Sequence, residues 1–369
     1  MGYSRVKDQE VAARLLRNIT GRGRIPNGLL FWGPAGVGKS LAAHEFAKAL
    51  NCAEKGGDAC DACLSCRKTD HGNHPDVKVI SPKSRSRVIK VDAVNEMTEM
   101  TMYRPFEGGR RVFIIEDADR MNEPAQNHFL KTLEEPVSAT VFVLITSAPR
   151  LLLPTIRSRC QAVRFGALRP ETVAELLTAQ AGVSPEKAAA LAALSQGQMG
   201  RALDLALSGR RDLVMDVVDR LRDGEDPLVV ADRFTATLDK IEKDIAAKVR
   251  EGLEAASGED DPDGDGEAAL DQEDRRSREE IEAQVASRMR QERYELVYLF
   301  QTWYRDELVY RAAGDPDRVL NRDRMAALAS MKSPGRPEKL EALNQAWVYL
   351  ERNISPGRVF RDLFFTLAG

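Results

Sequence analysis

The chain has 369 residues, of which 43% are hydrophobic and 30% charged, and its formal net charge is −3. This length exceeds what one hydrophobic core usually supports, so we expect a soluble globular protein of two or three domains. The sequence contains no apolar run long enough to span a membrane and its start lacks a signal peptide's apolar core, so we expect a cytoplasmic protein without membrane contact.

Five apolar, β-rich runs recur in the first 165 residues and alternate with helix-like stretches. The runs are residues 28–32, 76–80, 111–115, 141–146 and 161–165. Strands that alternate with helices form a parallel sheet with helices on both faces. The sequence therefore predicts an α/β domain over residues 1–165.

The stretch GPAGVGKS follows the first of these runs and fits the phosphate-loop pattern GxxxxGK(S/T). Its glycines let backbone N–H groups converge on phosphate oxygens, Lys39 reaches the outer phosphates, and the Ser40 hydroxyl can ligand Mg²⁺. We expect ATP and Mg²⁺ to bind here. The binding residues would be Gly33, Pro34, Ala35, Gly36, Val37, Gly38, Lys39 and Ser40. The alternative is a glycine turn that joins strand to helix without binding nucleotide.

Four of the five cysteines lie within fifteen residues, in the spacing C-x7-C-x2-C-x2-C. They are Cys52, Cys60, Cys63 and Cys66. Such crowding favours a metal site in a reducing compartment over disulfides, and four thiolates can close a tetrahedral Zn²⁺ shell that leaves no position for water. We therefore predict a structural zinc module at about residues 51–75, with free thiols or redox chemistry as the alternatives. The nearby His71 and His74 are expected at the surface.

The apolar run 111–115 delivers two carboxylates, Glu116 and Asp117, to its carboxyl end. P-loop ATPases place an acid there to hold Mg²⁺, and hydrolysing members add a base that positions water. The sequence thus suggests a nucleotide site assembled from two neighbouring loops. The alternative is that both carboxylates only cap the strand.

Beyond residue 166 only helical periodicity remains. Residues 166–208 predict a small helical unit, and residues 209–369 predict a helical bundle. Residues 251–282 hold 14 acidic and three basic residues, so we predict a disordered loop or linker over 256–275. The stretch 261–272 nearly meets a calcium-loop pattern, but a glutamine fills the last ligand position, which favours an acidic linker.

Four segments together resemble the AAA+ clamp-loader family of bacterial DNA polymerase III. They are residues 33–40, 113–136, 142–165 and 197–203. The resemblance is close over about the first 205 residues and extends to the helical remainder only in length and pattern. It implies a P-loop AAA+ domain over residues 1–165, a helical lid over 166–208 and an all-α oligomerisation collar over 209–369.

The resemblance also implies roles for the two carboxylates. Glu116 falls where the motor subunits of the family have the Asp that supports Mg²⁺, and Asp117 falls where they have the catalytic Glu. The order is reversed, so a longer acid crowds the metal shell and a shorter acid falls short of the attacking water. We therefore expect ATP binding with weak or absent hydrolysis, and Asp117 as a poor catalytic base.

Three further positions match family motifs. Arg159, in SRC, matches the arginine finger that stabilises the transferring phosphoryl group in a neighbouring subunit's pocket. Thr146 and Ser147 match the first sensor, which reads the outer phosphate. Arg201, in GQMGRAL, matches the second sensor, which would bring the lid onto bound nucleotide. A surface arginine, a strand end and a solvated helix arginine are the respective alternatives.

The resemblance implies a subunit of a hetero-oligomeric DNA polymerase complex. Its partners would be tau/gamma and delta loader subunits, the sliding clamp, and primer-template DNA contacted through its phosphate backbone. The basic stretch 81–90 could contact phosphates or a partner, or be a solvated loop. Two other interpretations remain open: an active tau/gamma-like ATPase, which the Glu116–Asp117 order disfavours, and a zinc-containing interaction module with a vestigial loop.

Overall fold

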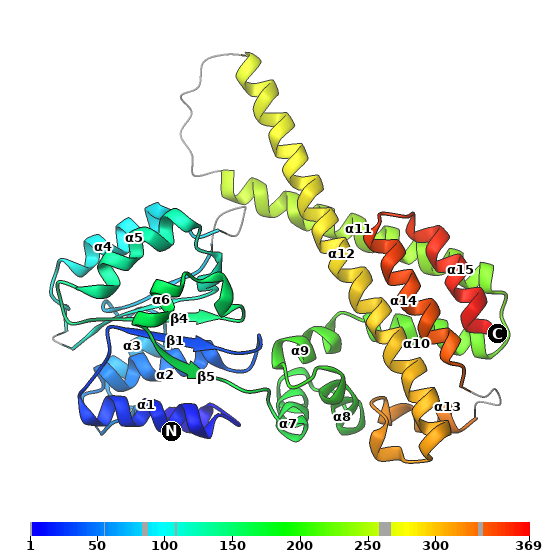
Figure 1. Ribbon diagram of the computed structural model, residues 1–369, viewed down its shortest axis with the longest axis horizontal. Helices are drawn as coiled ribbons and strands as arrows, with labels where there is room; N and C mark the ends of the chain where they lie inside the picture. The colour runs from blue at the N-terminus through cyan, green and yellow to red at the C-terminus, as the bar shows by residue number, and fades with distance from the viewer. Residues whose placement is uncertain (1, 55, 83–87, 108, 258–266, 331–334) are drawn as a thin grey trace. The chain divides into compact units, whose positions relative to one another are not determined.

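The computed structural model describes residues 2–54, 56–82, 88–107, 109–257, 267–330 and 335–369. The chain divides into two compact units (Figure 1). The first unit comprises Met1–Gln180 and Ser195–Leu203, and the second comprises Ala181–Leu194 and Asp204–Gly369. The division into nucleotide domain, lid and collar stays a prediction.

The first unit is built on a five-stranded parallel sheet in the order β2-β3-β4-β1-β5. The strands are β1 (Gly28–Trp32), β2 (Val77–Ile80), β3 (Arg111–Ile115), β4 (Thr140–Thr146) and β5 (Gln161–Arg164). Every neighbouring pair is parallel, which confirms the predicted α/β class. Because β1, β3 and β4 are adjacent, the loops that follow them meet at one edge of the sheet, where ligands of such folds bind.

Helices cover both faces of the sheet, and each face has its own apolar core. The helices are α1 (Glu10–Arg22) and α2 (Lys39–Asn51) on one face, and α4 (Val91–Thr101), α5 (Glu123–Glu134) and α6 (Pro154–Arg159) on the other. Successive residues of β3 serve opposite cores, with Phe113 on the α5 side and Ile114 on the α2 side. Burial on both faces explains why the central strands are continuously apolar rather than alternating.

The second unit is all helical. Its main helices are α8 (Pro185–Leu194), α10 (Arg210–Arg222), α11 (Pro227–Ser257), α12 (Glu267–Ala313), α13 (Met325–Ser330), α14 (Pro337–Glu351) and α15 (Pro356–Ala368). Phe234, Phe300, Phe360 and Phe364 interlock in its core, with ring centroids 4.8–6.0 Å apart. Among the described helices, none combines the length and apolar character that crossing a membrane requires.

The acidic insertion differs from its prediction. The structure extends α11 to Ser257 and begins α12 at Glu267, so the predicted loop over 256–275 is wrong at both of its ends. Residues 258–266, which carry most of the calcium-like pattern, lie outside the described residues. The ends are helical because they are rich in Ala, Glu, Leu, Gln and Arg, which have high helix propensity whatever their net charge.

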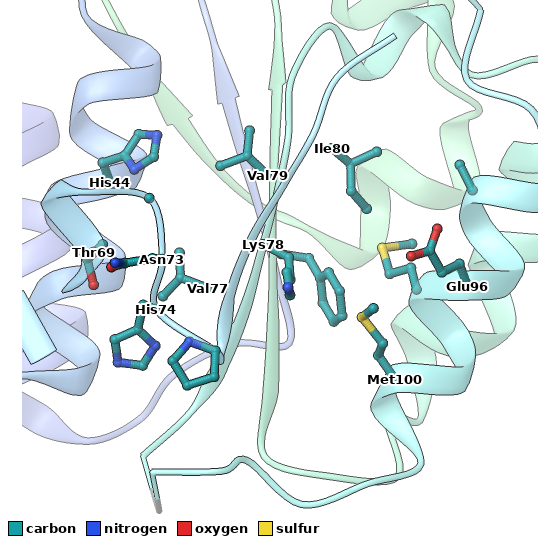
Figure 2. Close-up of a pocket in the computed structure, with 15 residues that line it drawn as sticks. His44, Thr69, Asn73, His74, Val77, Lys78, Val79, Ile80, Glu96 and Met100 are labelled. Atoms are coloured by element: carbon teal, nitrogen blue, oxygen red, sulfur yellow. The ribbon is translucent and has the colours of Figure 1, made fainter. Parts of the chain in front are cut away.

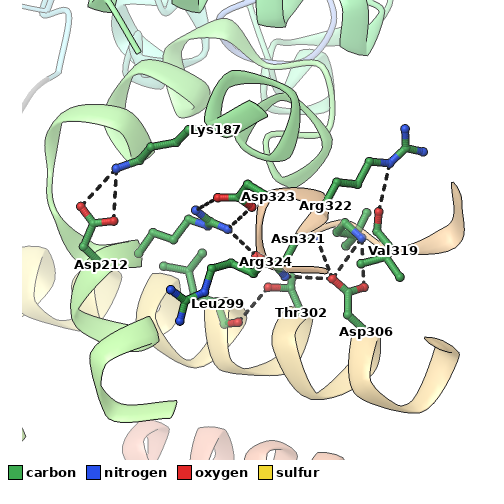
Figure 3. A network of polar contacts seen from close by, with 12 residues as sticks. Lys187, Asp212, Leu299, Thr302, Asp306, Val319, Asn321, Arg322, Asp323 and Arg324 are labelled. Atoms are coloured by element: carbon green, nitrogen blue, oxygen red, sulfur yellow. Dashed lines mark hydrogen bonds and ion pairs between the residues drawn. The ribbon is translucent and has the colours of Figure 1, made fainter. Parts of the chain in front are cut away.

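A buried polar network ties α10 and α12 to the turn at Arg322–Arg324 (Figure 3). Arg211, 3% exposed, donates to Asp323 at 2.7 and 2.8 Å and to the Asn321 Oδ1 at 3.0 Å. Asp306, fully buried, accepts hydrogen bonds from the backbone N–H groups of Leu320 and Asn321 and from the Asn321 Nδ2 at 2.9 Å. Long-range pairing thus fixes a segment that has little regular structure of its own.

Replacing Asp306 with alanine should lower the free energy of unfolding by about 3 kcal/mol, because two buried donors of Asn321 and the half-buried Leu320 N–H would lose their acceptor. Urea unfolding followed by tryptophan fluorescence measures this, since Trp303 and Trp347 both belong to the second unit. The matched control is Arg361→Ala, which removes an exposed ion pair and should cost under about 1 kcal/mol. If both substitutions lowered the free energy of unfolding equally, the buried network around Asp306 would not be the stabilising contact described here.

Candidate nucleotide site and metal centre

The phosphate loop joins β1 to α2, as the sequence predicts, and its glycines are required. Gly36 and Gly38 have φ of 69° and 94°, in the left-handed region. A Cβ on Gly33 would lie 2.2 Å from the Phe165 carbonyl oxygen, and a Cβ on Gly36 would lie 2.6 Å from the Gly200 nitrogen. The loop therefore has space only for backbone at these two positions.

Lys39 lies at the first position of α2 and is 7% exposed. Its Nζ donates to the Gly33 carbonyl at 2.8 Å and to the Pro34 carbonyl. Burial lowers the pKa of Lys39, while the charges of Asp117 and Asp119 oppose that shift. A phosphate that binds this ammonium would replace the two loop carbonyls.

A cavity of about 310 Å³ lies beside the loop, near the lower end of the range for small-molecule pockets. It is lined by Ala35, Gly36, Gly38, Lys39, Ser40, Leu41, Asp117, Ile145, Thr146, Ser147, Met199 and Gly200. The structure thus brings residues of the loop, the second carboxylate and both first-sensor residues to one place. Five of the predicted nucleotide-site residues are not among the lining residues: Gly33, Pro34, Val37, Glu116 and Arg201.

The carboxylates after β3 adopt an unusual backbone. Glu116 is half-buried, and its N–H donates to the Ile80 carbonyl at 2.8 Å. Asp117 is exposed and has φ of 45°, a left-handed conformation that Asp adopts more readily than most residues. The chain therefore turns sharply between the two acids, and only the second reaches the cavity.

Thr146 ends β4 and is 1% exposed. Its hydroxyl donates to the Asp119 carboxylate and accepts the Ala148 N–H at 2.9 Å. Sequence reasoning missed Asp119, which lies in a short 3-10 turn after β3. Its position could have indicated it, because Asp119 follows Glu116 by three residues, about one helical turn, and so lies at the same edge of the sheet.

The first residues of the helix α9 (Met199–Leu207) belong to the first unit and contact the phosphate loop. The Met199 N–H donates to the Gly36 carbonyl at 3.0 Å. Arg201, the predicted second sensor, lies two residues further along α9 and is half-buried. Its role stays a prediction.

Arg159 ends α6, and its side chain is 41% exposed. The guanidinium forms an ion pair with Glu134 of α5 and donates to the Thr155 carbonyl at 3.2 Å. Sequence reasoning missed Glu134. The neighbouring Cys160 is buried, which raises the pKa of its thiol to about 12, so this fifth cysteine is a neutral core residue.

The four predicted zinc ligands converge, although they come from a loop and from α3 (Leu64–Asp70). Their Sγ atoms all lie within 4.8 Å of one another, and a tetrahedral shell with Zn–S of about 2.3 Å needs sulfurs about 3.8 Å apart. The Cys63 N–H donates to the Cys60 Sγ at 3.3 Å, as in metal-binding turns. Burial alone would raise the pKa of Cys63, but hydrogen bonds from the Ala53 and Cys66 N–H groups lower it to about 6. The residues fit Zn²⁺.

The cysteine cluster is anchored to α2, the helix that follows the phosphate loop. Lys48 of α2 is completely buried and pairs with Asp61, between two of the cysteines, at 2.5 Å and with Asp70 at 3.0 Å. Asp61 also accepts the Gly2 N–H at 3.0 Å. The predicted module is therefore continuous with the nucleotide fold through charged contacts.

A second cavity, of about 460 Å³, lies beside the edge strand β2 (Figure 2). His74, on its wall, is 3% exposed, so the prediction of a surface histidine is wrong for His74. The ring is buried because both nitrogens are satisfied: Nδ1 accepts the Asp76 N–H at 3.1 Å, and Nε2 lies 3.0 Å from the Ser65 Oγ. The proton is therefore on Nε2, which excludes this histidine as a base toward Ser65.

The basic stretch 81–90 is only partly described, because residues 83–87 lie outside the described residues. Its predicted contact with phosphates or with a partner stays a prediction.

Comparison with known proteins gives consistent matches. A family model described as "DNA polymerase III, delta subunit" matches residues 8–169. DNA polymerase III subunit delta' of Bacillus subtilis (strain 168) is 38% identical over 179 residues, which are 48% of this chain and 54% of that protein. The subunit delta' of Pseudomonas aeruginosa is 35% identical over 212 residues, 56% of this chain and 64% of that protein.

A match to a different subunit, tau, covers a larger share of this chain than the delta' matches do. DNA polymerase III subunit tau of Escherichia coli (strain K12) is 30% identical over 264 residues, 70% of this chain and 39% of that protein. The chain spans little more than half of the length of the first delta' relative. Over residues 8–169 the chain is similar to the DNA polymerase III delta subunit family and, in the curated relatives, to its delta' subunits.

Proposed function

We propose that this chain is a delta'-like clamp-loader subunit of the DNA polymerase III holoenzyme. It would help to load the sliding clamp onto primed DNA and would donate Arg159 to the nucleotide pocket of a neighbouring ATPase subunit. The observation that carries this proposal is the half-exposed guanidinium at the end of α6, braced by Glu134. A residue that acts on another subunit has to be accessible and still be held in position.

The chemistry asked of Arg159 is electrostatic. As negative charge develops on the transferring phosphoryl group, a guanidinium supplies a charge that is never lost by deprotonation and a planar set of donors that fits phosphate oxygens. Glu134 holds the side chain before assembly, and phosphate oxygens would then replace the carboxylate. The ion pair is exposed, so exchanging it costs little.

The chain's own pocket would bind ATP with Mg²⁺ but hydrolyse it weakly or not at all. Backbone N–H groups of the loop and Lys39 are the groups for the phosphates, and the Ser40 hydroxyl and a carboxylate would hold the metal. When bound, Mg²⁺ would neutralise part of the negative charge of the phosphates. Among the described residues that line the cavity, Asp117 is the one carboxylate, and its side chain is shorter than the glutamate base of active members.

The four cysteines would hold a structural Zn²⁺, as their mutual distances suggest. The expected partners are tau/gamma and delta subunits, the sliding clamp, and primer-template DNA bound through phosphates and hence salt-dependently. The second unit would supply the oligomerisation collar. Under this proposal the chain works in the bacterial cytoplasm as part of a hetero-oligomer.

A second candidate is an active tau/gamma-like motor, favoured by the complete phosphate-loop pattern and by the similarity to tau. The third, a zinc-containing interaction module with a vestigial loop, predicts no association with a loader. These candidates differ in two measurable properties, turnover and assembly.

Assembly and turnover are therefore the direct test. Mixed with tau/gamma and delta, the purified chain should co-elute as one hetero-oligomer, and alone it should hydrolyse ATP far below the roughly 1–10³ s⁻¹ typical of enzymes. Size-exclusion chromatography and phosphate release measure the two properties. Rapid turnover by the isolated chain would favour the motor, while failure to assemble would leave the interaction module.

A further inference from the structure

Asp119 adds a third carboxylate at the carboxyl edge of the sheet, after the two that directly follow β3. It lies in a short turn, η2 (Ala118–Arg120). The turn is fixed, because Ala118 is fully buried and its carbonyl accepts the Met121 N–H at 3.2 Å. Asp119 is half-buried, and its carboxylate accepts the hydroxyl of Thr146, at the end of the adjacent strand β4. One hydrogen bond therefore separates this carboxylate from a residue that lines the nucleotide cavity.

The Thr146 hydroxyl is fully used by the protein itself. A hydroxyl carries one proton, and this one is already donated to Asp119. The same oxygen accepts the Ala148 N–H at 2.9 Å, and the residue is 1% exposed. While these contacts last, Thr146 cannot donate to a phosphate. Its effect on a ligand is therefore indirect, because it holds a negative charge against the wall of the cavity.

Negative charge exceeds positive charge around this cavity. Among the described residues that line it, Lys39 is the one cation, whereas Asp117 lines it and Asp119 lies directly behind it. Burial lowers the pKa of Lys39, and the charges of these two carboxylates act in the opposite direction, so both are within electrostatic reach of the ammonium. Neither carboxylate forms an ion pair with a residue in the described part of the chain. The cavity thus places two carboxylates near one ammonium.

The outermost phosphate of a triphosphate is the group that these charges would meet. In phosphate loops the backbone N–H groups cradle the inner phosphates, and the lysine reaches the outer ones. The outer phosphates extend toward the carboxyl end of the strand that carries the acids, which here is β3, beside β4. A diphosphate ends before this region, whereas a triphosphate brings additional negative charge into it.

We propose that Asp119 is a specificity-determining residue that makes this pocket prefer a nucleoside diphosphate to a triphosphate. Held by Thr146, its carboxylate repels the outermost phosphate more strongly than the inner ones, because Coulomb repulsion falls with distance. The inference rests on the proposed binding of nucleotide in this pocket and deepens it by naming the preferred ligand. It also gives a reason for weak hydrolysis, since the pocket would hold the product more tightly than the substrate.

The ratio of the dissociation constants for ATP and ADP tests the proposal in the full-length chain. Displacement of a fluorescent ADP analogue measures both constants, at low salt and without added Mg²⁺, so that the phosphate charges are not masked. The wild type should bind ADP more tightly than ATP. Asp119→Asn keeps the shape and an acceptor for Thr146, and it should lower the ratio of the ATP to the ADP constant about fivefold or more. Asp119→Ala, equally uncharged, should lower the ratio similarly, while the ADP constant changes by less than about twofold.

The control is Glu99→Gln, which removes the same charge from an exposed position near the end of α4. That helix returns the chain to the start of β3, at the opposite edge of the sheet, so the ratio should not change. Circular dichroism verifies that every variant is folded.

Three results would overturn the inference while nucleotide binding itself stands. They are a wild type that binds ATP more tightly than ADP, a ratio that neither Asp119 variant changes, and a loss of affinity in Asp119→Asn that occurs only with Mg²⁺, because Asp119 would then be a metal ligand. A wild type that binds neither nucleotide would instead refute the proposed nucleotide binding, and this inference with it.

Discussion

Replacing Arg159 with alanine is expected to lower ATP turnover by the assembled loader roughly 10³-fold or more, because an arginine supplied in trans contributes that much to phosphoryl transfer. Arg159 ends a short helix, its side chain is half-exposed, and its anchors are an ion pair with Glu134 and one backbone carbonyl. None of these contacts lies in an apolar core, so the variant should fold. Phosphate release by the reconstituted loader, with clamp and primed DNA, measures the effect.

Three variants sharpen this experiment. Arg159→Lys keeps the charge but loses the planar fork, so it should recover little of the turnover. Arg157→Ala removes another exposed arginine of the same helix and should have no effect. Lys39→Ala alters this chain's own pocket and should change total turnover little. Wild-type turnover with Arg159→Ala would refute the finger, and a large loss with Lys39→Ala would instead indicate a motor.

Removing the metal is expected to have the second-largest effect, on stability. Purified protein should contain one Zn²⁺ per chain, and Cys66→Ser should abolish it, since this fully buried sulfur completes the four-ligand set. The loop that carries Asp61 would then be released. Lys48, completely buried, would lose Asp61 but keep Glu45 and Asp70, so this contact adds about 1.5–3 kcal/mol, the range for a hydrogen bond to a charged group, to the loss of the metal itself.

Urea unfolding with and without a chelator measures this loss, and a metal assay reports the stoichiometry. The control is Cys160→Ala, because this buried thiol lies outside the cluster and its loss should leave zinc content unchanged. Protein with less than stoichiometric zinc but full stability would show that the four cysteines are free thiols. A chelator that removes zinc without lowering the free energy of unfolding would refute the anchoring role of Lys48.

Local sequence pattern was sufficient for the sheet and for the grouping of the nucleotide site. Strands buried on both faces are continuously apolar, and adjacent parallel strands bring their following loops together whatever lies between them in sequence. That is why the loop at 33–40, Asp117 and Thr146 could be expected in one place. The cysteine spacing was likewise sufficient for a four-sulfur cluster.

The sequence did not predict which side chains pair when they lie far apart along the chain. The pairing of Arg159 with Glu134 depends on how the chain folds back, which no local pattern encodes. His74 was misjudged because its burial depends on Ser65 and a backbone N–H. The acidic insertion was predicted wrongly because its high net charge indicates disorder, whereas its residues have high helix propensity and helices tolerate charge at exposed positions.

If the pocket binds nucleotide as proposed, the hydrogen bond from the Met199 N–H to the Gly36 carbonyl makes the affinity a composite quantity. A triphosphate entering the loop competes with the chain's own backbone and with the carbonyls that hold Lys39. If the competent arrangement is populated only as a fraction of molecules, the apparent dissociation constant rises by the inverse of that fraction. Neighbouring subunits that favour the open arrangement would then tighten binding without touching the ligand.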